Sequence, residues 1–345
     1  MTSMTSAKPT IRDVARVCGV SVATVSYVIN GTRVLKQETR DRVHRAMEEM
    51  NYTPSAVARG LLSKRVHTLG VHCSVMRADQ FITNPYAAGI LSGILNRAQQ
   101  EEFDVTLFTN RWEDVQTSAP ALRDGRTDGM IALAPPLHCD MLGGLAALGM
   151  PIVGIAAQSH DGIDTVDVDN YAGAKLATRH LIELGHRRIG AIMGNEDMAS
   201  FAPRSRGLRD ALHDANLTLL PEHFTASRFD GSLAFEQTRE LLSQSDRPTA
   251  ICAGNDTIAI AVIEAAHSLN LKVPDDLSVI GFDDLPMATV IRPNLTTIRQ
   301  PLRAIGERAA TLLIERMRGE LCETVPTAHL LAPELIVRDS CAPLT

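Results

Sequence analysis

Beyond residue 66 the sequence alternates short apolar runs with stretches of helical periodicity, and this alternation restricts the possible folds more than any other feature. The apolar runs are LGVHCSV, DVTLFT, GMIALA and PIVGIA, and then RIGAIMG, TAICAG and LSVIGFD. The helical stretches span residues 86–100, 118–124, 140–148, 171–184, 204–215, 231–243 and 256–269. A repeat of strand and helix builds parallel sheets that helices cover on both faces. Two such series predict two α/β lobes, with a cleft where the carboxyl ends of their strands meet.

The first 66 residues follow a different pattern. From residue 10 to residue 51, apolar residues recur every three or four positions without a strand-like alternation. This periodicity predicts three short helices, at 11–18, 22–29 and 37–49. The segment 52–66 contains Pro54 and Gly60 ahead of a basic stretch, and we interpret it as a hinge. The predicted organisation is a disordered tail at 1–9, a helical domain at 10–51, the hinge at 52–66 and a large domain at 67–345.

The first two predicted helices carry small and apolar residues where a steep helix crossing needs them. Ala15 lets the second helix approach closely, and Gly19 can take the positive φ of a tight turn. Val25 and Val28 lie at helical spacing and should pack against the first helix. This pattern predicts a helix-turn-helix unit, and an ordinary helical hairpin is the structural alternative.

The ends and the outer face of these helices also fit a helix-turn-helix. Thr10 and Ser21 stand at N-cap positions, and Asp13 can complete a capping box with Thr10. Four residues of the second helix then point outward, namely Val22, Ala23, Ser26 and Tyr27. In helix-turn-helix proteins this face of the second helix enters the major groove of DNA.

Charge is divided unevenly along the chain. The whole chain has a net charge of −6. Residues 8–66 hold 11 Lys and Arg against 5 Asp and Glu, whereas the remainder holds 23 against 35. A basic head on an acidic body favours a phosphate-rich partner for the head alone, such as double-stranded DNA.

Other classes of function find little support in the sequence. The motifs GxSxG, HExxH and GxxxxGK[ST] do not occur, so we expect no enzyme and no cofactor. The six cysteines are scattered without metal-ligand spacing, which predicts reduced thiols and no metal site. Residues 1–9 are polar and lack a signal-peptide pattern, and no apolar run is long enough to span a bilayer. We therefore expect a cytoplasmic protein with no membrane contact.

The helical domain resembles the LacI/GalR family of bacterial repressors. It carries the family's N-terminal signature as TIRDVARVCGVSVATVSYVING, followed by TRDRVHRAMEEMNYTPSAVARGL, and the resemblance continues to the end of the chain. The resemblance implies an all-α helix-turn-helix head on a two-lobed α/β body built like the periplasmic sugar-binding proteins. It also implies a transcriptional repressor that binds operator DNA and senses a small polar effector, for which a sugar is the favoured class.

The resemblance assigns DNA contacts to eight residues. Val22, Ala23 and Tyr27 match family positions that touch base edges, although many members have Arg at the last of these. Val22 has the alternative of partial burial against the third helix. The positions that hold phosphates match four short polar residues, Thr24, Ser26, Asn30 and Thr39. Leu61 matches a hinge leucine that wedges into the minor groove and kinks the DNA.

The resemblance also assigns effector contacts in the cleft of the body. Arg204 in PRSRGL matches an arginine that grips the effector, and Asn255 in AGND and Asp283 in GFDD match partners of sugar hydroxyls. These side chains suit adjacent hydroxyls because each forms hydrogen bonds in a fixed geometry. Tyr86 and Phe229 match aromatic contacts, which stack on a sugar ring or on a nucleobase, unless they belong to the core.

The polar residues of the cleft have structural alternatives as well. Arg204 and Asp283 can form an ion pair across the cleft. Asn255 can cap the helix that begins near residue 257, but we expect its neighbour Asp256 to be that cap.

The sequence also bears on rival functions and on assembly. The alternative of a transport-type binding protein that does not bind DNA explains the body but does not explain residues 10–61. Operator symmetry predicts a homodimer. The chain ends eight residues after Val337, without room for the leucine-repeat helix that makes tetramers in this family, so we expect no assembly beyond the dimer. The effector can act as inducer or as corepressor, because both occur on this scaffold.

Overall fold

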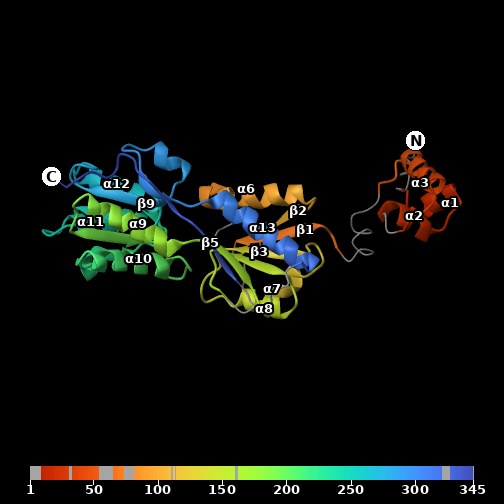
Figure 1. Cartoon of the computed structure of the whole chain (residues 1–345), viewed down its shortest axis with the longest axis horizontal. Coiled ribbons are helices and arrows are strands. Elements are labelled where there is room, and N and C mark those ends of the chain that lie inside the picture. Colours follow the sequence, from red (N-terminus) through yellow and green to blue (C-terminus); the bar gives the residue numbers. More distant parts are fainter. Residues whose placement is uncertain are drawn as a thin grey trace, which may run out of the picture. The chain divides into compact units, whose positions relative to one another are not determined.

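The structure is a computed structural model that describes residues 9–30, 33–53, 65–73, 81, 83–109, 112, 114–159, 162–320 and 327–344. The chain divides into two compact units, Met1–Val66 and His67–Thr345. We call them the head and the body and describe each by itself (Figure 1). No helix within the described ranges is long and apolar enough to cross a membrane.

The described part of the head contains three helices, as the periodicity predicts. They are α1 (Ile11–Cys18), α2 (Val22–Asn30) and α3 (Gln37–Glu49). The carboxylate of Asp13 accepts hydrogen bonds from the backbone nitrogen and the hydroxyl of Thr10, at 3.0 and 2.7 Å. Ser21 caps α2, because its hydroxyl accepts the Thr24 amide at 3.1 Å. Gly19 has φ +61°, the left-handed conformation that the turn between α1 and α2 requires.

A small apolar core fixes the crossing of the three helices. Its buried residues are Val14, Ala15, Cys18, Val25, Val28, Val43 and Ala46. Val14, Val25 and Val43 come from different helices and have no exposed surface. Burying a valine side chain contributes about 1.5–3 kcal/mol, so these contacts hold the outer face of α2 in a defined orientation.

The first lobe of the body is built on a six-stranded sheet in the order β11-β5-β4-β3-β1-β2. Its strands are β1 (Thr68–Cys73), β2 (Asp104–Phe108), β3 (Gly129–Leu133), β4 (Ile152–Ile155), β5 (Asp164–Val168) and β11 (Ala328–Leu331), all paired in parallel. Its helices are α6 (Pro85–Gln100), α7 (Val115–Leu122), α8 (Met141–Ala147) and α13 (Leu302–Arg318). Ile131 and Leu133 of β3 face α6 and α13, whereas Met130 and Ala132 face α7 and α8 (Figure 1).

The second lobe repeats this plan with the strand order β12-β10-β9-β8-β6-β7. Its strands are β6 (Ile189–Met193), β7 (Phe224–Ala226), β8 (Ala250–Ala253), β9 (Ser278–Asp283), β10 (Thr296–Arg299) and β12 (Glu334–Ile336). Its helices are α9 (Asn170–Glu183), α10 (Phe201–Asp214), α11 (Gly231–Leu242) and α12 (Asp256–Ser268), with short 3-10 turns at Pro221–His223 and Pro286–Thr289. β12 pairs antiparallel with β10, and the other pairings are parallel.

The chain passes between the lobes after β5, after β10 and after β11. The fold class predicted from the sequence is confirmed, with an all-α head and a two-lobed α/β body. The strands and helices predicted from the sequence end with β9. The structure also contains α13, β10, β11 and β12, together with β5 and β7, none of which was predicted. Helix α7 begins at 115 and not at 118, because the carboxylate of Asp114 accepts the Thr117 amide at 2.8 Å and caps the helix earlier.

Candidate functional site

Helix α2 presents to solvent the face that was predicted to meet DNA. Val22 is 42% exposed and Ala23 is exposed, so any burial of Val22 is only partial. Tyr27 is half-buried, and the guanidinium of Arg33 lies 5.7 Å from the centre of its ring. This face therefore offers an aromatic side chain with an exposed cation beside it, flanked by two small apolar residues.

The residues predicted to hold phosphates lie around the same helix. Thr24 shares a hydrogen bond of 2.9 Å with the hydroxyl of Ser21, so its side chain also takes part in the cap of α2. Ser26 is half-buried on α2, and Thr39 is half-buried in the first turn of α3. The side chain of Asn30 and the whole of Leu61 lie outside the described residues.

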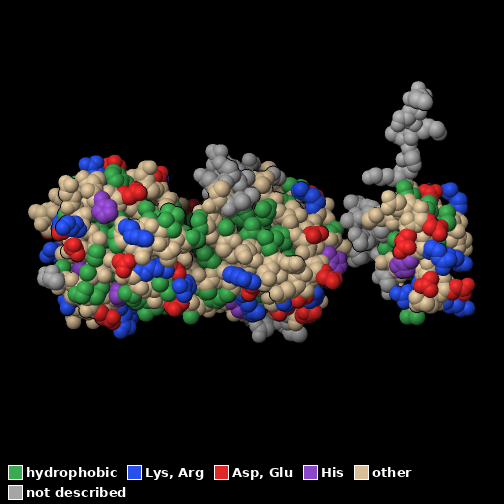
Figure 2. Space-filling view, turned by 90° about the horizontal axis from the view of Figure 1, so that it is seen from above, with side chains coloured by type: hydrophobic (Ala, Val, Ile, Leu, Met, Phe, Trp, Pro, Cys, Tyr) green, Lys and Arg blue, Asp and Glu red, His purple; other side chains and the backbone are tan. Residues whose placement is uncertain are grey.

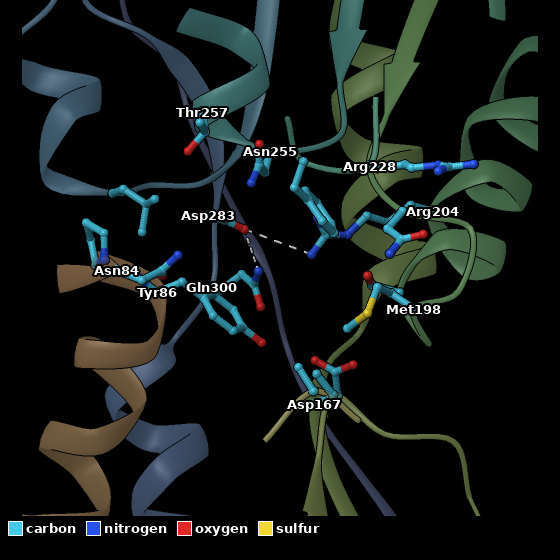
Figure 3. A pocket seen from close by; sticks show the side chains of 17 residues that line it. Asn84, Tyr86, Asp167, Met198, Arg204, Arg228, Asn255, Thr257, Asp283 and Gln300 are labelled. Atoms are coloured by element: carbon cyan, nitrogen blue, oxygen red, sulfur yellow. Dashed lines mark hydrogen bonds and ion pairs between the residues drawn. The ribbon is translucent and has the colours of Figure 1, made fainter. Parts of the chain in front are cut away.

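A cavity of about 380 Å³ lies in the body (Figure 3). It is lined by residues of both lobes, including Tyr86, Asp167, Asn195, Arg204, Phe229, Asn255, Asp283 and Gln300. Most of them stand at the carboxyl end of a strand or in the first turn of the helix that follows it. This is where open parallel sheets bind ligands, and the volume suits a small molecule.

The backbone around the cavity is strained at several strand ends. Five lining residues other than glycine have positive φ, namely Ala134 (+48°), Ala156 (+49°), Arg228 (+55°), Phe229 (+60°) and Asp283 (+123°). Such conformations are costly for residues with a Cβ and persist where the surrounding structure holds them. Their concentration here marks the cavity as a functional site.

Arg204 is held in the first turn of α10 by the second lobe itself. Its Nε donates to Oδ1 of Asn170 at 2.8 Å, and its Nη1 donates to the carbonyl of Gly254 at 2.5 Å. The guanidinium stacks over Phe282, 3.6 Å from the ring centre, and the residue is 7% exposed. Its Nη2 lies 3.9 Å from Oδ1 of Asp283.

Asp283 ends β9 and is 5% exposed. It accepts a hydrogen bond of 2.6 Å from Nε2 of Gln300. Burial raises the pKa of Asp283, and the nearby Arg204 opposes this rise. The expected alternative of an ion pair with Arg204 is realised only at 3.9 Å, beyond hydrogen-bond distance, so both groups can still bond toward the cavity.

Asn255, and not Asp256, caps helix α12. Oδ1 of Asn255 accepts the Ile258 amide at 2.9 Å and caps α12, so the prediction that Asp256 is the cap is wrong. The reason is the backbone: Asn255 is extended, as an N-cap must be, whereas Asp256 is the first helical residue. Figure 3 shows the amide nitrogen of Asn255 turned toward the cavity, where it can still donate.

Asp256 braces the cavity from behind. It is fully buried and accepts the Leu285 amide at 2.7 Å and the Thr297 hydroxyl at 2.5 Å. Burial and the charge of Asp283 raise its pKa to about 8, which favours the protonated form at neutral pH. Asp256 thus ties the segment after β9 to β10 without adding a charge behind the cavity.

The two predicted aromatic contacts differ in burial. Tyr86 stands in the first turn of α6, which Asn84 caps, and packs partly against the main core. Burial raises the pKa of Tyr86 further above its usual value, so its hydroxyl keeps its proton. Phe229 is 37% exposed and its ring fills the space beside Gly194, where a Cβ would come within 2.2 Å of it. The core alternative therefore applies in part to Tyr86 and not to Phe229.

Several polar residues of the cavity lining were not predicted from the sequence, Asp167 and Gln300 among them, and neither was Asn170, which hydrogen-bonds to both Asp167 and Arg204. Asp167 is the residue before the last of β5, Asn170 begins α9, and Gln300 follows β10. Each stands at a strand end or helix start, as Asn255 and Asp283 do, so the same rule would have found them. The segments DTVDV and TTIR are too polar to be recognised as strands, so the sequence does not mark the positions of Asp167 and Gln300 as strand ends.

Comparison with known proteins agrees with this division of the chain. Residues 10–55 match the family model of bacterial regulatory proteins of the lacI family, and residues 178–341 match a periplasmic binding protein-like domain. The HTH-type transcriptional repressor PurR of Aliivibrio salmonicida is 35% identical over 338 residues, which are 96% of this chain and 98% of the relative.

Two solved structures extend the likeness to the fold of the whole chain. The lac repressor dimer bound to operator and the anti-inducer ONPF superposes with a TM-score of 0.84 at 27% identity, covering 97% of this chain and 99% of that one. The complex of the transcriptional regulator CelR with cellobiose has a TM-score of 0.74 at 30% identity, covering 96% and 99% of the two chains.

Proposed function

The chain belongs to the lacI family of bacterial regulatory proteins, and we propose that it represses transcription by binding operator DNA under the control of a small polar effector. One observation carries the proposal. A single chain contains both a helix-turn-helix and a body with a polar cavity of about 380 Å³. The outer face of the second helix of the helix-turn-helix is exposed to solvent. The role is regulation and not catalysis, and it places the protein in the cytoplasm, where operator DNA is.

For the head, we propose that Val22, Ala23 and Tyr27 contact base edges in the major groove. The exposed positions of Val22 and Ala23 at the start of α2 support this assignment. We assign phosphate contacts to Thr24, Ser26, Asn30 and Thr39, which fix the register of the head on the duplex. Leu61 is proposed to wedge into the minor groove between two half-sites.

For the body, we propose that the effector is a sugar or a sugar-like molecule. Arg204, Asn255 and Asp283 supply a guanidinium, an amide and a carboxylate to the same cavity, which suits adjacent hydroxyls. Phe229 is accessible to stack on the ring of the ligand, and Tyr86 lines the opposite lobe. Cellobiose in the CelR complex is a ligand of this class.

We further propose that the protein acts as a homodimer on a pseudo-palindromic operator. The lac repressor relative binds its operator as a dimer. Figure 2 shows hydrophobic side chains gathered on the face of the body that carries α6, where Leu95 is 47% exposed. A twofold assembly presents two heads to two half-sites about one helical turn apart.

The proposal is tested by selecting duplexes from a randomised library with the full-length protein. We expect enrichment of a pseudo-palindrome with half-sites about 10 bp apart. The selected duplex is then titrated by fluorescence anisotropy with sugars, nucleosides and phosphosugars, and at least one compound should shift its affinity. A shuffled duplex is the control for non-specific binding. Enrichment of no sequence, or equal affinity for the shuffled duplex, would contradict the function.

The same selection tests the reading of bases by α2. A tyrosine hydroxyl forms one hydrogen bond, whereas arginine binds the two acceptors of guanine at once and discriminates by about 1–3 kcal/mol. We therefore expect Tyr27→Arg to shift one position of each half-site toward guanine. Thr39→Ala is the matched control, because loss of a phosphate contact weakens all sequences about equally. An unchanged motif with Tyr27→Arg would mean that Tyr27 does not face a base.

A further inference from the structure

The charges buried around the cavity do not balance. Asp167, Asp283 and Arg204 surround the space from the two lobes, which gives two carboxylates and one guanidinium. Arg228 also lines the cavity, but Figure 3 shows its guanidinium turned away from the space, and the residue is exposed. A neutral ligand therefore leaves one buried negative charge without a counter-ion.

The guanidinium of Arg204 is bonded to residues of the second lobe. Two of its nitrogens are hydrogen-bonded to Asn170 and to Gly254, and its remaining nitrogen lies 3.9 Å from Asp283. Asp283 is in turn bonded to Gln300. The single guanidinium lies closest to the carboxylate of its own lobe, and its charge also lowers the pKa of Asp167, so one cation serves two carboxylates.

Asp167 lies across the cavity, on β5 of the first lobe, and has only neutral partners. Its carboxylate accepts the backbone amide of Val168 and Nδ2 of Asn170, each at 2.8 Å. Among the described residues, no nitrogen of Lys, Arg or His lies within 4.0 Å of it. Burial raises the pKa of Asp167 to about 6 although the charge of Arg204 opposes this rise, so the group is mostly ionised at neutral pH and has no ion-pair partner of its own.

A second acceptor at the cavity, Oε1 of Gln300, has no donor in the described part of the chain. Gln300 is 4% exposed, and its Nε2 must face the carboxylate of Asp283, which only accepts. Its Oε1 is therefore turned away, and it has no hydrogen-bond partner in the described part of the chain. Figure 3 shows this oxygen on the side of Gln300 that faces Tyr86 and Asp167. A buried acceptor without a donor is costly unless a ligand satisfies it.

We propose that the effector carries a protonated amino group, as an amino sugar does, and that this group binds between the carboxylate of Asp167 and Oε1 of Gln300. An ammonium has a positive charge, three donors and no acceptor. It can therefore donate to both Asp167 and Oε1 of Gln300 and balance the net negative charge of the cavity. A hydroxyl can donate to either oxygen but leaves the charge of Asp167 unmatched. The inference rests on the proposed function, because it names the ligand class of the effector cavity, which also offers Arg204, Asn255 and Asp283 to hydroxyls.

The test is isothermal calorimetry of the full-length protein at pH 7 with matched ligands. D-glucosamine, D-galactosamine and D-mannosamine are each compared with the N-acetylated form and with the parent hexose. We expect at least one amine to bind about tenfold or more tightly than both of its neutral counterparts, because charge-assisted hydrogen bonds are about twice as strong as neutral ones. Equal affinity across all three sets would overturn the proposal.

Two variants connect the preference to Asp167. Asp167→Asn keeps the shape of the side chain and removes its charge, so the ratio of amine to hexose affinity should fall toward one. Asp169→Asn is the matched control, since Asp169 caps α9 through the Ala172 amide and asparagine also caps helices well. A ratio that persists in Asp167→Asn would overturn the assignment. Operator binding by the same wild-type preparation, measured with and without each ligand, tests the proposed function separately from the amine preference.

Discussion

An Arg204→Ala variant is expected to lose its response to the effector, with ligand affinity reduced by about tenfold or more. The guanidinium is the only cation within 4.0 Å of Asp283 among the described residues, and its fork is fixed by two hydrogen bonds and by stacking on Phe282. Hydrogen bonds to charged groups contribute about 1.5–3 kcal/mol each, and 1.4 kcal/mol is tenfold in affinity. The measurement is calorimetry with any ligand that the wild type binds, together with operator titrations with and without that ligand.

Arg204 acts through its geometry as well as its charge, and two further variants separate these effects. Arg204→Lys keeps the positive charge but has no planar fork, so we expect an affinity between those of the wild type and Arg204→Ala. Arg206→Ala is the matched control, because Arg206 lies two residues further on α10, is exposed and stacks over Tyr171 outside the cavity. Wild-type ligand affinity in Arg204→Ala would rule out Arg204 as a ligand contact.

The helices of the head were predictable from the sequence because the signals that set their bounds are local. The capping box joins residues three apart, Thr10 and Asp13, and the turn depends on the single glycine at 19. The buried valines of α2 recur at helical spacing. Local spacing and cap chemistry therefore fixed all three helices to within one residue.

The body was predictable only where its strands are apolar. Strand β10 reads TTIR, yet Thr296 and Thr297 are fully buried, because the Thr296 hydroxyl accepts the Arg338 amide and the Thr297 hydroxyl donates to Asp256. Buried polar residues satisfied by distant partners do not produce an apolar run. The return of the chain to the first lobe through α13 also depends on long-range packing, so no local pattern indicates it.

The candidate site shows the same division. Arg204, Asn255 and Asp283 were predicted from their motifs, and the structure places all three at one cavity. The error at Asp256 concerns which of two adjacent residues has extended backbone, and both are good cap residues by chemistry. Asp167 belongs to a strand that was not recognised, and its position opposite the second lobe comes from the order of strands in the sheet.

Helices α6 and α13 cross in the first lobe with their backbones in direct contact, and two glycines make this possible (Figure 1). A Cβ at Gly306 of α13 would lie 2.0 Å from the carbonyl oxygen of Ile90, and one at Gly93 of α6 would lie 2.0 Å from that of Arg303. Backbone atoms within a helix cannot shift aside as a flexible side chain can. A side chain at either position must therefore push the helices apart, which opens the core that contains Ile90 and Ile94.

Gly306→Val is accordingly expected to be among the most destabilising single substitutions in the body. Overpacking costs about 1–3 kcal/mol and occasionally more, and separating the helices adds the loss of buried contacts at about 25 cal/mol per Å². With a total stability of about 5–15 kcal/mol, we expect a fall in Tm of about 10 °C or failure to fold at 37 °C. The check is thermal unfolding followed by circular dichroism, with Gly231→Val as the matched control, since a Cβ at Gly231 meets no atom within 4 Å. If the two variants unfold at the same temperature, the backbones of α6 and α13 are not in direct contact at Gly306.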